Sequence, residues 1–597
     1  MISKMKKYTF LVFHRDYEPF LEQLRELGVV HITQKAAGLI ENDETLQAAL
    51  QKEDELRRII RQGAPDQLLQ ERDAIQQRMA DAQQAAQEAA VWGDFDTKRI
   101  EALKKAGYTM RFFVCPANAY KEEWGIALNT VAGKTYFVAV NNATNENNAT
   151  NENYENYANY ATELLLPEKS EAQFLQEAEH LNGLLAAANA RIEAWQLANL
   201  EKLRKELAEA RQVIDWTRVN LSTDKLADGA LCLLEGFCPV DKEAELNDML
   251  AKAQVYYEET DPTEEDQTPI KLHNNKFAKL FEPLTGMYGW PNYNEFDPTP
   301  ILAPFYLLFF AMCMGDGGYG ILLMLFGILT TKKKINIEMF EGCGPLITVL
   351  GAGTFVVGIA LGTFFGINLY EASWYPEALK AFIIQGEVAG YNIQMVLALA
   401  IGVFHICLAM VVKALCYTRQ TGFKNNLSAW GWSLLIIGGI ITVILSMCAV
   451  LPENVTKITL IAIGVISALG IYIFNTPGRN PLINIGAGLW DTYNMVTGLI
   501  GDTLSYVRLF ALGLAGGMLG SAFNNLGMMI LGDGEGSIVG LVLKGIGALV
   551  ILLIGHVLNL LLSALGAFVH PLRLTFVEYF KNAGYEGKGG LYSPFKK

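Results

Sequence analysis

The residue best suited to chemistry is Arg508, which lies inside an apolar segment long enough to span a lipid bilayer. A guanidinium group keeps its proton in proteins, so Arg508 is a permanent positive charge. Placing such a charge in the hydrocarbon layer costs ~3 kcal/mol on insertion scales, and an intramembrane arginine is therefore expected to have a function. Arg573 occupies the last apolar segment. Two permanent cations in consecutive segments predict an ion path, or a counter-charge for a carboxylate.

Each of these two segments carries a polar stripe along one helical face. At about 100° per residue, the polar residues of each stripe fall within an arc of roughly 140°. The first stripe ends at Arg508 and holds Asp491, Asn494, Thr497, Asp502 and Ser505, and the second includes Arg573 and holds His556, Asn559, Ser563, His570 and Glu578. Two such stripes could line aqueous routes that meet at a permanent charge. Alternatively, these groups pair among themselves and only stabilise a helix bundle.

Two further polar residues interrupt the apolar segments. Asp316 lies in the glycine cluster Met314-Gly-Asp-Gly-Gly-Tyr-Gly320, where it either forms a structural turn or belongs to the ion path. His405 is a lone polar residue in another segment and is interpreted as a core histidine.

No catalytic motif accompanies these residues. Ala132-Gly-Lys-Thr135 resembles the end of a phosphate-binding loop, but the first glycine that this loop requires is replaced by Leu128. The eight cysteines show no metal-type spacing. We therefore expect no catalytic, cofactor or metal site, and no nucleotide hydrolysis by this chain alone.

Eight apolar segments in the second half predict an α-helical membrane domain. They lie near 300–314, 317–331, 344–367, 393–414, 429–450, 457–474, 490–530 and 540–580. The last two hold about 40 residues each, which at 1.5 Å per residue gives ~60 Å of helix against a hydrocarbon layer of ~30 Å. Such helices must tilt strongly or protrude, and we expect two long tilted helices at the C-terminal end.

Lysine and arginine are unequally distributed between the predicted loops. One side carries Lys332, Lys333, Lys334, Lys413, Arg419, Lys424, Arg479, Lys581, Lys588, Lys596 and Lys597. The other carries Lys380, Lys457 and Lys544, with Glu371, Glu377, Glu387, Asp533 and Glu535. Because positive loops stay in the cytoplasm, an even number of spans places both termini there. The expected location is the cell membrane.

The acidity of the chain lies entirely in its first half. Residues 291–597 carry 16 Lys and Arg against 15 Asp and Glu, so the totals of 48 and 62 leave 32 against 47 for residues 1–290. We therefore expect a cytoplasmic domain at 1–290 and a transmembrane domain at 291–597. A strongly acidic domain argues against nucleic acid as a partner.

The N-terminal domain is predicted to be an α+β dumbbell. Polar helices over 42–91 and 168–218 each have a thin apolar seam, and they could pair as an antiparallel coiled-coil stalk. Strands near 7–14, 28–33, 109–115 and 135–140, and an α/β unit at 230–258, would form compact knobs. The asparagine-rich stretch 141–159 is interpreted as a disordered insert.

Several motifs resemble the stator membrane subunit of rotary V-type and archaeal-type ATPases, subunit I or subunit a. They are Ser505-Tyr-Val-Arg-Leu-Phe-Ala-Leu-Gly-Leu-Ala515, Val91-Trp-Gly-Asp-Phe-Asp96, Leu284-Thr-Gly-Met-Tyr-Gly-Trp-Pro-Asn-Tyr-Asn-Glu-Phe-Asp-Pro-Thr-Pro300, Met314-Gly-Asp-Gly-Gly-Tyr-Gly320 and His570-Pro-Leu-Arg-Leu-Thr-Phe-Val-Glu578. The resemblance covers nearly the whole chain except 141–159. It implies a subunit from a bacterium that is not an enzyme on its own.

The resemblance also implies a mechanism and partners. A proteolipid ring would turn past the two long helices, and Arg508 with Arg573 would face its carboxylates while H⁺ or Na⁺ passes through two half-channels. The N-terminal domain would be anchored to peripheral stalks of E/G type, beside a central stalk connector and a soluble V1/A1-type ATPase head. Eukaryotic relatives carry His and Glu where this chain has Gly516 and Ser563, so the half-channel residues are not transferable as a set.

Two other classes remain possible from the residues alone. A stand-alone secondary transporter or channel with a cytoplasmic regulatory domain would explain the charged spans, although the chain lacks the internal repeat common in transporters. A structural scaffold would leave both intramembrane arginines without a role. Neither the coupling ion, nor the direction of ATP turnover, nor the ring size follows from the sequence.

Overall fold

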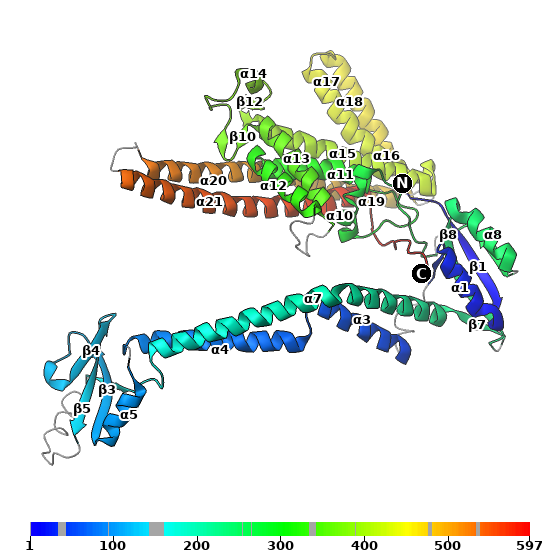
Figure 1. Cartoon of the computed structure of the whole chain (residues 1–597). Coiled ribbons are helices and arrows are strands. Elements are labelled where there is room, and N and C mark those ends of the chain that lie inside the picture. The colour runs from blue at the N-terminus through cyan, green and yellow to red at the C-terminus, as the bar shows by residue number, and fades with distance from the viewer. Residues whose placement is uncertain are drawn as a thin grey trace. The chain divides into compact units, whose positions relative to one another are not determined.

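The computed structural model describes residues 2–33, 43–93, 95–142, 160–227, 229–253, 255–263, 266–332, 342–388, 390–475, 480–532 and 538–596 (Figure 1). The predicted insert at 141–159 lies outside these residues except for 141–142. So do the predicted loop charges Lys333, Lys334, Arg479, Asp533, Glu535 and Lys597. The chain forms two compact units, Met1–Thr33 with Asp224–Lys597, and Gln34–Thr223. A domain boundary at residue 290 stays a prediction.

Paired helices dominate the unit Gln34–Thr223. α3 (Glu44–Gln62) and α4 (Asp66–Ala90) pack against the 52-residue α7 (Glu171–Ser222), as Figure 1 shows for α4 and α7. The pairing is antiparallel, because Glu53 bonds Arg211 and Glu71 bonds Arg191, both at 3.0 Å. One continuous helix over 42–91 was the wrong prediction. Gly63 at φ 79° ends α3, and the sequence restarts after Pro65.

A small sheet completes this unit. Its strands β3 (Tyr108–Pro116), β4 (Ile126–Val131), β5 (Lys134–Asn142) and β6 (Thr162–Leu164) pair antiparallel in the order β4-β5-β3-β6, with α5 (Thr97–Lys105) beside them. Phe113, Cys115 and Phe137 form its core. This is the α/β unit predicted between the two helical arms.

The other unit begins with a second sheet that joins distant parts of the chain. Strands β1 (Met5–Phe13), β2 (His31–Ile32), β8 (Leu231–Pro239) and β9 (Tyr256–Thr260) follow the order β2-β8-β1-β9, and β7 (Asp224–Leu226) pairs with β8. The helices α1 (Tyr17–Leu27) and α8 (Glu243–Ala253) accompany them. The sequence predicted separate α/β elements here. The two strands β1 and β2 are too few for a stable sheet of their own. They join β7, β8 and β9 in one sheet, in which Tyr8 and Phe10 are buried.

Six helical stretches among the described residues are long and apolar enough to cross a membrane. They comprise α13 (Gly344–Leu361), α15 (Ile393–Thr421), α16 (Leu427–Ser433) with α17 (Gly439–Met447), α18 (Glu453–Ala468), α19 (Pro481–Ser505) with α20 (Val507–Leu531), and α21 (Ile538–Arg573) continued by α22 (Phe580–Ala583). Single π-helical turns, Leu434–Gly438 and Leu574–Tyr579, join α16 to α17 and α21 to α22. The apolar helices α11 (Thr299–Met314) and α12 (Gly317–Thr331) are shorter, so the first two predicted spans, 300–314 and 317–331, stay predictions.

Short elements connect these helices. α9 (Lys276–Lys279) and α10 (Glu282–Tyr288) precede α11, and the hairpins β10 (Thr363–Phe364) with β11 (Ile367–Asn368) and β12 (Glu387–Val388) with β13 (Tyr391–Asn392) flank α14 (Glu377–Lys380). α12 packs closely on α13 through glycines. A Cβ on Gly320 would lie 2.4 Å from the Phe355 nitrogen, so these backbones touch directly, as small residues permit in membrane helices.

The two long C-terminal helices are present, with one interruption. α20 and α21 run side by side in Figure 1. The predicted first long helix is divided at Tyr506, between α19 and α20. No proline causes this break, and its origin in the packing of Tyr506 is described below.

The C-terminal tail returns to the N-terminal sheet. Gly589 and Leu591 form bridges with Trp290 and Ile270. The Phe595 N–H then donates to the Val30 carbonyl at 2.8 Å. The segment after α22 is thereby tied to the residue before β2 within one unit, a contact that nothing in the sequence predicted.

Candidate ion-path site

Arg508 is the second residue of α20, directly after the helix break. Its side chain is half-buried, and its Nη1 atom is buried without a hydrogen-bond partner among the described residues. Leaving a guanidinium donor unpaired in an apolar region is costly. A cation held in this state is ready to attract a carboxylate supplied from outside the chain.

Four other predicted residues surround this charge. Both guanidinium groups, of Arg508 and the exposed Arg573, are close enough to act on the His570 ring. The Glu578 carboxyl group interacts with the Ser505 hydroxyl and lies in the field of Arg573. His570 Nδ1 and Glu578 Oε2 are also buried without a partner in the described part of the chain. Buried polar atoms without a partner in the described chain therefore occur on three of the predicted residues: Arg508, His570 and Glu578.

A polar cavity of about 510 Å³ lies beside α19, which precedes Arg508 in the chain. Asp491, Asn494 and Asp502 of the first stripe line it, together with Lys413 and Lys581. By the distribution of positive loops, this is the predicted cytoplasmic side.

Two asparagines hold the carboxylates of this cavity in place. Asn475 donates to Asp491 at 3.1 Å, and Asn582 donates to Asp502 at 2.8 Å. The Lys581 ammonium lies 3.6 Å from the Asp502 carboxylate. Sequence analysis missed both asparagines, because they lie outside the two stripes and only the fold brings them there.

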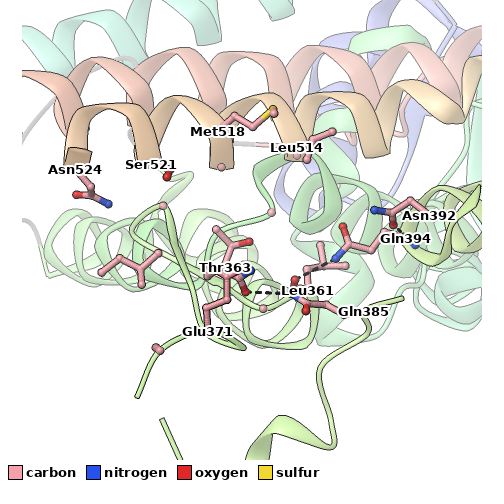
Figure 2. A pocket seen from close by; sticks show the side chains of 18 of the residues that line it. Leu361, Thr363, Glu371, Gln385, Asn392, Gln394, Leu514, Met518, Ser521 and Asn524 are labelled. Atoms are coloured by element: carbon pink, nitrogen blue, oxygen red, sulfur yellow. Dashed lines mark hydrogen bonds between the residues drawn. The ribbon is translucent and has the colours of Figure 1, made fainter. Parts of the chain in front are cut away.

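A larger cavity of about 900 Å³ lies beside α20 on the predicted outer side. Leu514, Met518, Ser521 and Asn524 line it from α20, and Figure 2 shows Thr363 of β10, Glu371, Gln385 and Gln394 of α15 across from this helix. Its described lining includes the carboxylates of Glu371 and Glu387 and amide side chains, and it contains no lysine or arginine. Such a lining attracts cations.

The two cavities reach the polar helix at different heights. Asp502 is the furthest α19 residue along the first cavity, and Gly513 is the nearest α20 residue along the second. Arg508 lies between them on the chain, within about 16 Å of helix at 1.5 Å per residue. Two polar cavities thus border the α19–α20 stretch, one before Arg508 and one after it in the chain.

His556 of the second stripe belongs to a buried hydrogen-bond network. Its Nε2 lies 3.0 Å from Asn524 Oδ1, and its Nδ1 lies 2.8 Å from the Tyr319 hydroxyl. The Asn524 amide is oriented by its own donation to the Phe365 carbonyl at 2.7 Å. Because Oδ1 only accepts, Nε2 carries the proton, and in the neutral ring Nδ1 accepts from Tyr319.

Asn559 and Ser563 extend the same network. Asn559 donates to the Tyr319 hydroxyl and to the Gly516 carbonyl, both at 2.9 Å, and accepts from Ser563 at 3.3 Å. A Cβ on Gly516 would lie 3.0 Å from Ser563 Oγ. The two positions at which this chain departs from eukaryotic relatives are therefore in contact.

Asp316 is buried, at 1% exposure, and accepts four backbone hydrogen bonds. Oδ1 accepts from Gly318 at 2.8 Å, Tyr319 at 3.3 Å and Phe365 at 2.8 Å, and Oδ2 accepts from Gly366 at 2.7 Å. The residue caps α12 and ties it to the β10–β11 turn that borders the outer cavity. These contacts favour the structural interpretation over direct ion contact.

Known proteins resemble this chain in sequence over most of its length. The sequence model of the V-type ATPase 116kDa subunit family matches residues 14–372 and 489–597. V-type ATP synthase subunit I of Borreliella burgdorferi is 26% identical over 655 aligned residues, which cover all of both chains. V-type ATP synthase subunit I 1 of Treponema pallidum is 26% identical over 654 residues with the same coverage.

An archaeal relative is more similar over a shorter range. A-type ATP synthase subunit I of Methanocaldococcus jannaschii is 31% identical over 391 residues, covering 60% of this chain and 53% of that protein. The family match extends over well more than half of the chain and includes Arg508, Arg573 and both polar stripes. The chain therefore belongs to the V-type ATPase 116kDa subunit family.

Proposed function

We propose that the protein is the membrane stator subunit of a rotary V/A-type ATPase, and that it forms H⁺ or Na⁺ half-channels beside a proteolipid ring. The observation that carries this proposal is Arg508, whose buried Nη1 has no partner among the described residues and which lies between the two polar cavities along the chain. Names of similar proteins support it, since they are called subunit I of V-type or A-type ATP synthases.

The chemistry follows from the placement of the charge. A carboxylate of the ring that approaches Arg508 is favoured in its ionised form, because an opposite charge nearby stabilises that form. Its bound cation then leaves into one cavity, and after rotation the site is loaded from the other. The carboxylates Asp491 and Asp502 would serve the cytoplasmic cavity, and Glu371 and Glu387 the outer one.

Arg508 has a second role in the same scheme. A cation crossing directly from one cavity to the other would have to pass a permanent positive charge in a region of low dielectric constant, where repulsion is weakly screened. The charge therefore blocks leakage, and ions cross only on the moving ring. Arg573, His570 and Glu578 would adjust the field at this position.

The remaining parts of the chain fit attachment and assembly. Peripheral stalks of E/G type would be anchored by the unit Gln34–Thr223, in which α3 and α4 pack against α7 and the sheet β4-β5-β3-β6 follows. The stator would lie in the lipid bilayer beside the ring and the central stalk connector, and the soluble V1/A1-type head would turn over ATP. The subunit itself would carry no catalytic site.

Two experiments test this proposal. Gentle extraction of the tagged chain, followed by mass spectrometry, should recover a small proteolipid with soluble ATPase and stalk subunits. Recovery of the chain alone, with ion flux after reconstitution, would instead establish the alternative of a stand-alone transporter or channel.

The second experiment replaces the central charge. Arg508→Ala should abolish ATP-driven ion transport while the complex still assembles, and Arg419→Ala, on an exposed arginine at the end of α15, should transport normally. Coupled transport at the normal rate in Arg508→Ala would overturn the proposal.

A further inference from the structure

The break between α19 and α20 sets the direction in which Arg508 points. Tyr506 N–H bonds the Thr503 carbonyl and Leu509 N–H bonds the Tyr506 carbonyl, both at 3.1 Å and both spanning three residues rather than four. Such tightened turns change the rotation of the helix locally. Because Arg508 follows Tyr506 by two residues, contacts that hold Tyr506 in place also set the direction around the helix axis in which the Arg508 side chain leaves α20.

Tyr506 is held in a socket on α15. The side chain is completely buried. A Cβ on Gly402 would lie 2.3 Å from the Tyr506 Cγ, so the ring rests directly on the α15 backbone. At the far end of the ring, the Tyr506 hydroxyl lies 2.9 Å from His405 Nδ1. Both ends of the Tyr506 side chain are therefore fixed by α15.

His405 also contacts the second long helix. Its ring stacks on Tyr579 with centroids 4.4 Å apart and planes at 10°, and Phe305 of α11 lies 4.3 Å away. Tyr579 ends the π-helical turn that contains Glu578. One imidazole therefore touches the break before Arg508 and the turn after Arg573.

The burial of His405 is costly. The residue is 0% exposed, and its Nε2 has no hydrogen-bond partner among the described residues. A phenylalanine would fill the same space among aromatic rings without an unpaired polar atom. A polar group kept at such a cost indicates a function, and the one hydrogen bond that it makes is to Tyr506.

We propose that His405 and Gly402 are positioning residues for Arg508. They hold Tyr506, and through it the helix break, so that the guanidinium faces the ring carboxylate at a constant angle. This inference rests on the proposed function. Gly402 and His405 lie outside the ranges matched by the family model, which omit residues 373–488.

The test removes the same hydrogen bond from either end in the full complex. His405→Phe keeps the stacking and loses Nδ1, while Tyr506→Phe keeps the ring and loses the hydroxyl. The matched control is Tyr579→Phe, because the Tyr579 hydroxyl has no partner in the described chain. For each variant, assembled complex, ATP hydrolysis and ATP-driven ion transport are measured, and transport is expressed per ATP hydrolysed.

We expect each of the two variants to assemble and to transport about fivefold fewer ions per ATP, the factor equivalent to ~1 kcal/mol for one buried neutral hydrogen bond. The double variant should show the same fivefold loss, since both changes remove one interaction. Tyr579→Phe should match the unmodified complex. A purely structural role would lower the yield of complex and leave the ratio unchanged.

Two results would overturn the inference. One is an unchanged ratio in both single variants, and the other is a loss of about 25-fold in the double variant, the product expected for independent effects. Arg508→Ala distinguishes this failure from that of the proposed function. If that variant abolishes transport while His405→Phe is fully coupled, only the positioning role is wrong.

Discussion

Replacing Asp316 tests whether its carboxylate has a structural role or takes part in ion conduction. In Asp316→Asn, the amide oxygen can keep the three N–H contacts made by Oδ1, while the amide nitrogen meets the Gly366 N–H that donates to Oδ2 at 2.7 Å. One buried charge-assisted bond is lost, at a cost of about 2 kcal/mol. Asp316→Ala leaves four backbone donors without this acceptor, at ~1–3 kcal/mol each.

These magnitudes predict different outcomes for the two variants. A loss of roughly 4–12 kcal/mol from Asp316→Ala is comparable to the whole stability of a typical domain, so folded complex should be scarce. Asp316→Asn should assemble with reduced thermal stability and keep its ion transport per ATP.

One assay heats the detergent-solubilised complex and measures the fraction that remains monodisperse. A second assay measures ion transport per ATP by the reconstituted complex. The reasoning would be refuted by an Asp316→Asn complex with unchanged stability and no transport. That result would place the Asp316 carboxylate in the ion path itself.

Three further predictions concern other parts of the chain. Gly320→Ala should lower the stability of the complex by about 1–3 kcal/mol in a thermal shift assay, because its Cβ would lie 2.4 Å from a backbone nitrogen of α13. Gly464→Ala, which has open space around it, should be neutral or stabilising. Equal effects of the two changes would contradict the close packing of α12 on α13. Burial lowers the pKa of His31, although a hydrogen bond to the Ser593 backbone opposes this. The C-terminal tail should therefore be docked above the ordinary pKa of ~6.5 and loosen as the pH falls through the lowered pKa, with faster hydrogen exchange at residues 589–596, and a pH-independent tail would refute this. Leu46→Ala should destabilise the helix pair of unit Gln34–Thr223 by ~2–4 kcal/mol in denaturant unfolding, since Leu46 is 2% exposed. A loss under 1 kcal/mol would show that the contact of Leu46 with Ile214 contributes little.

Sequence reasoning singled out the charged residues of the candidate site because such residues are rare in apolar segments. The periodicity of α19 and α21 placed Asp491, Asn494 and Asp502 on one face, and the structure puts these three in one cavity. The small sheet around Phe113 and the long helix α7 were likewise predictable, from alternation and from composition.

The remaining features depend on contacts that no local pattern records. Asn582 reaches Asp502 from 80 residues away, and Tyr319 reaches Asn559 from 240 residues away. The outer cavity is formed by a loop whose residues look like ordinary polar surface. His405 was correctly expected in the core, but its bond to Tyr506 became visible only when α15 was placed against the helix break.

The most direct test of the central claim is the access of water to the two cavities. In a variant without native cysteines, Asn494→Cys and Ser521→Cys are labelled in sealed vesicles of known orientation with a membrane-impermeant thiol reagent. The account predicts that Asn494→Cys reacts only from the cytoplasmic side, and Ser521→Cys only from the opposite side, because each lines a different cavity. Labelling of both cysteines from one side would contradict two offset half-channels separated by Arg508.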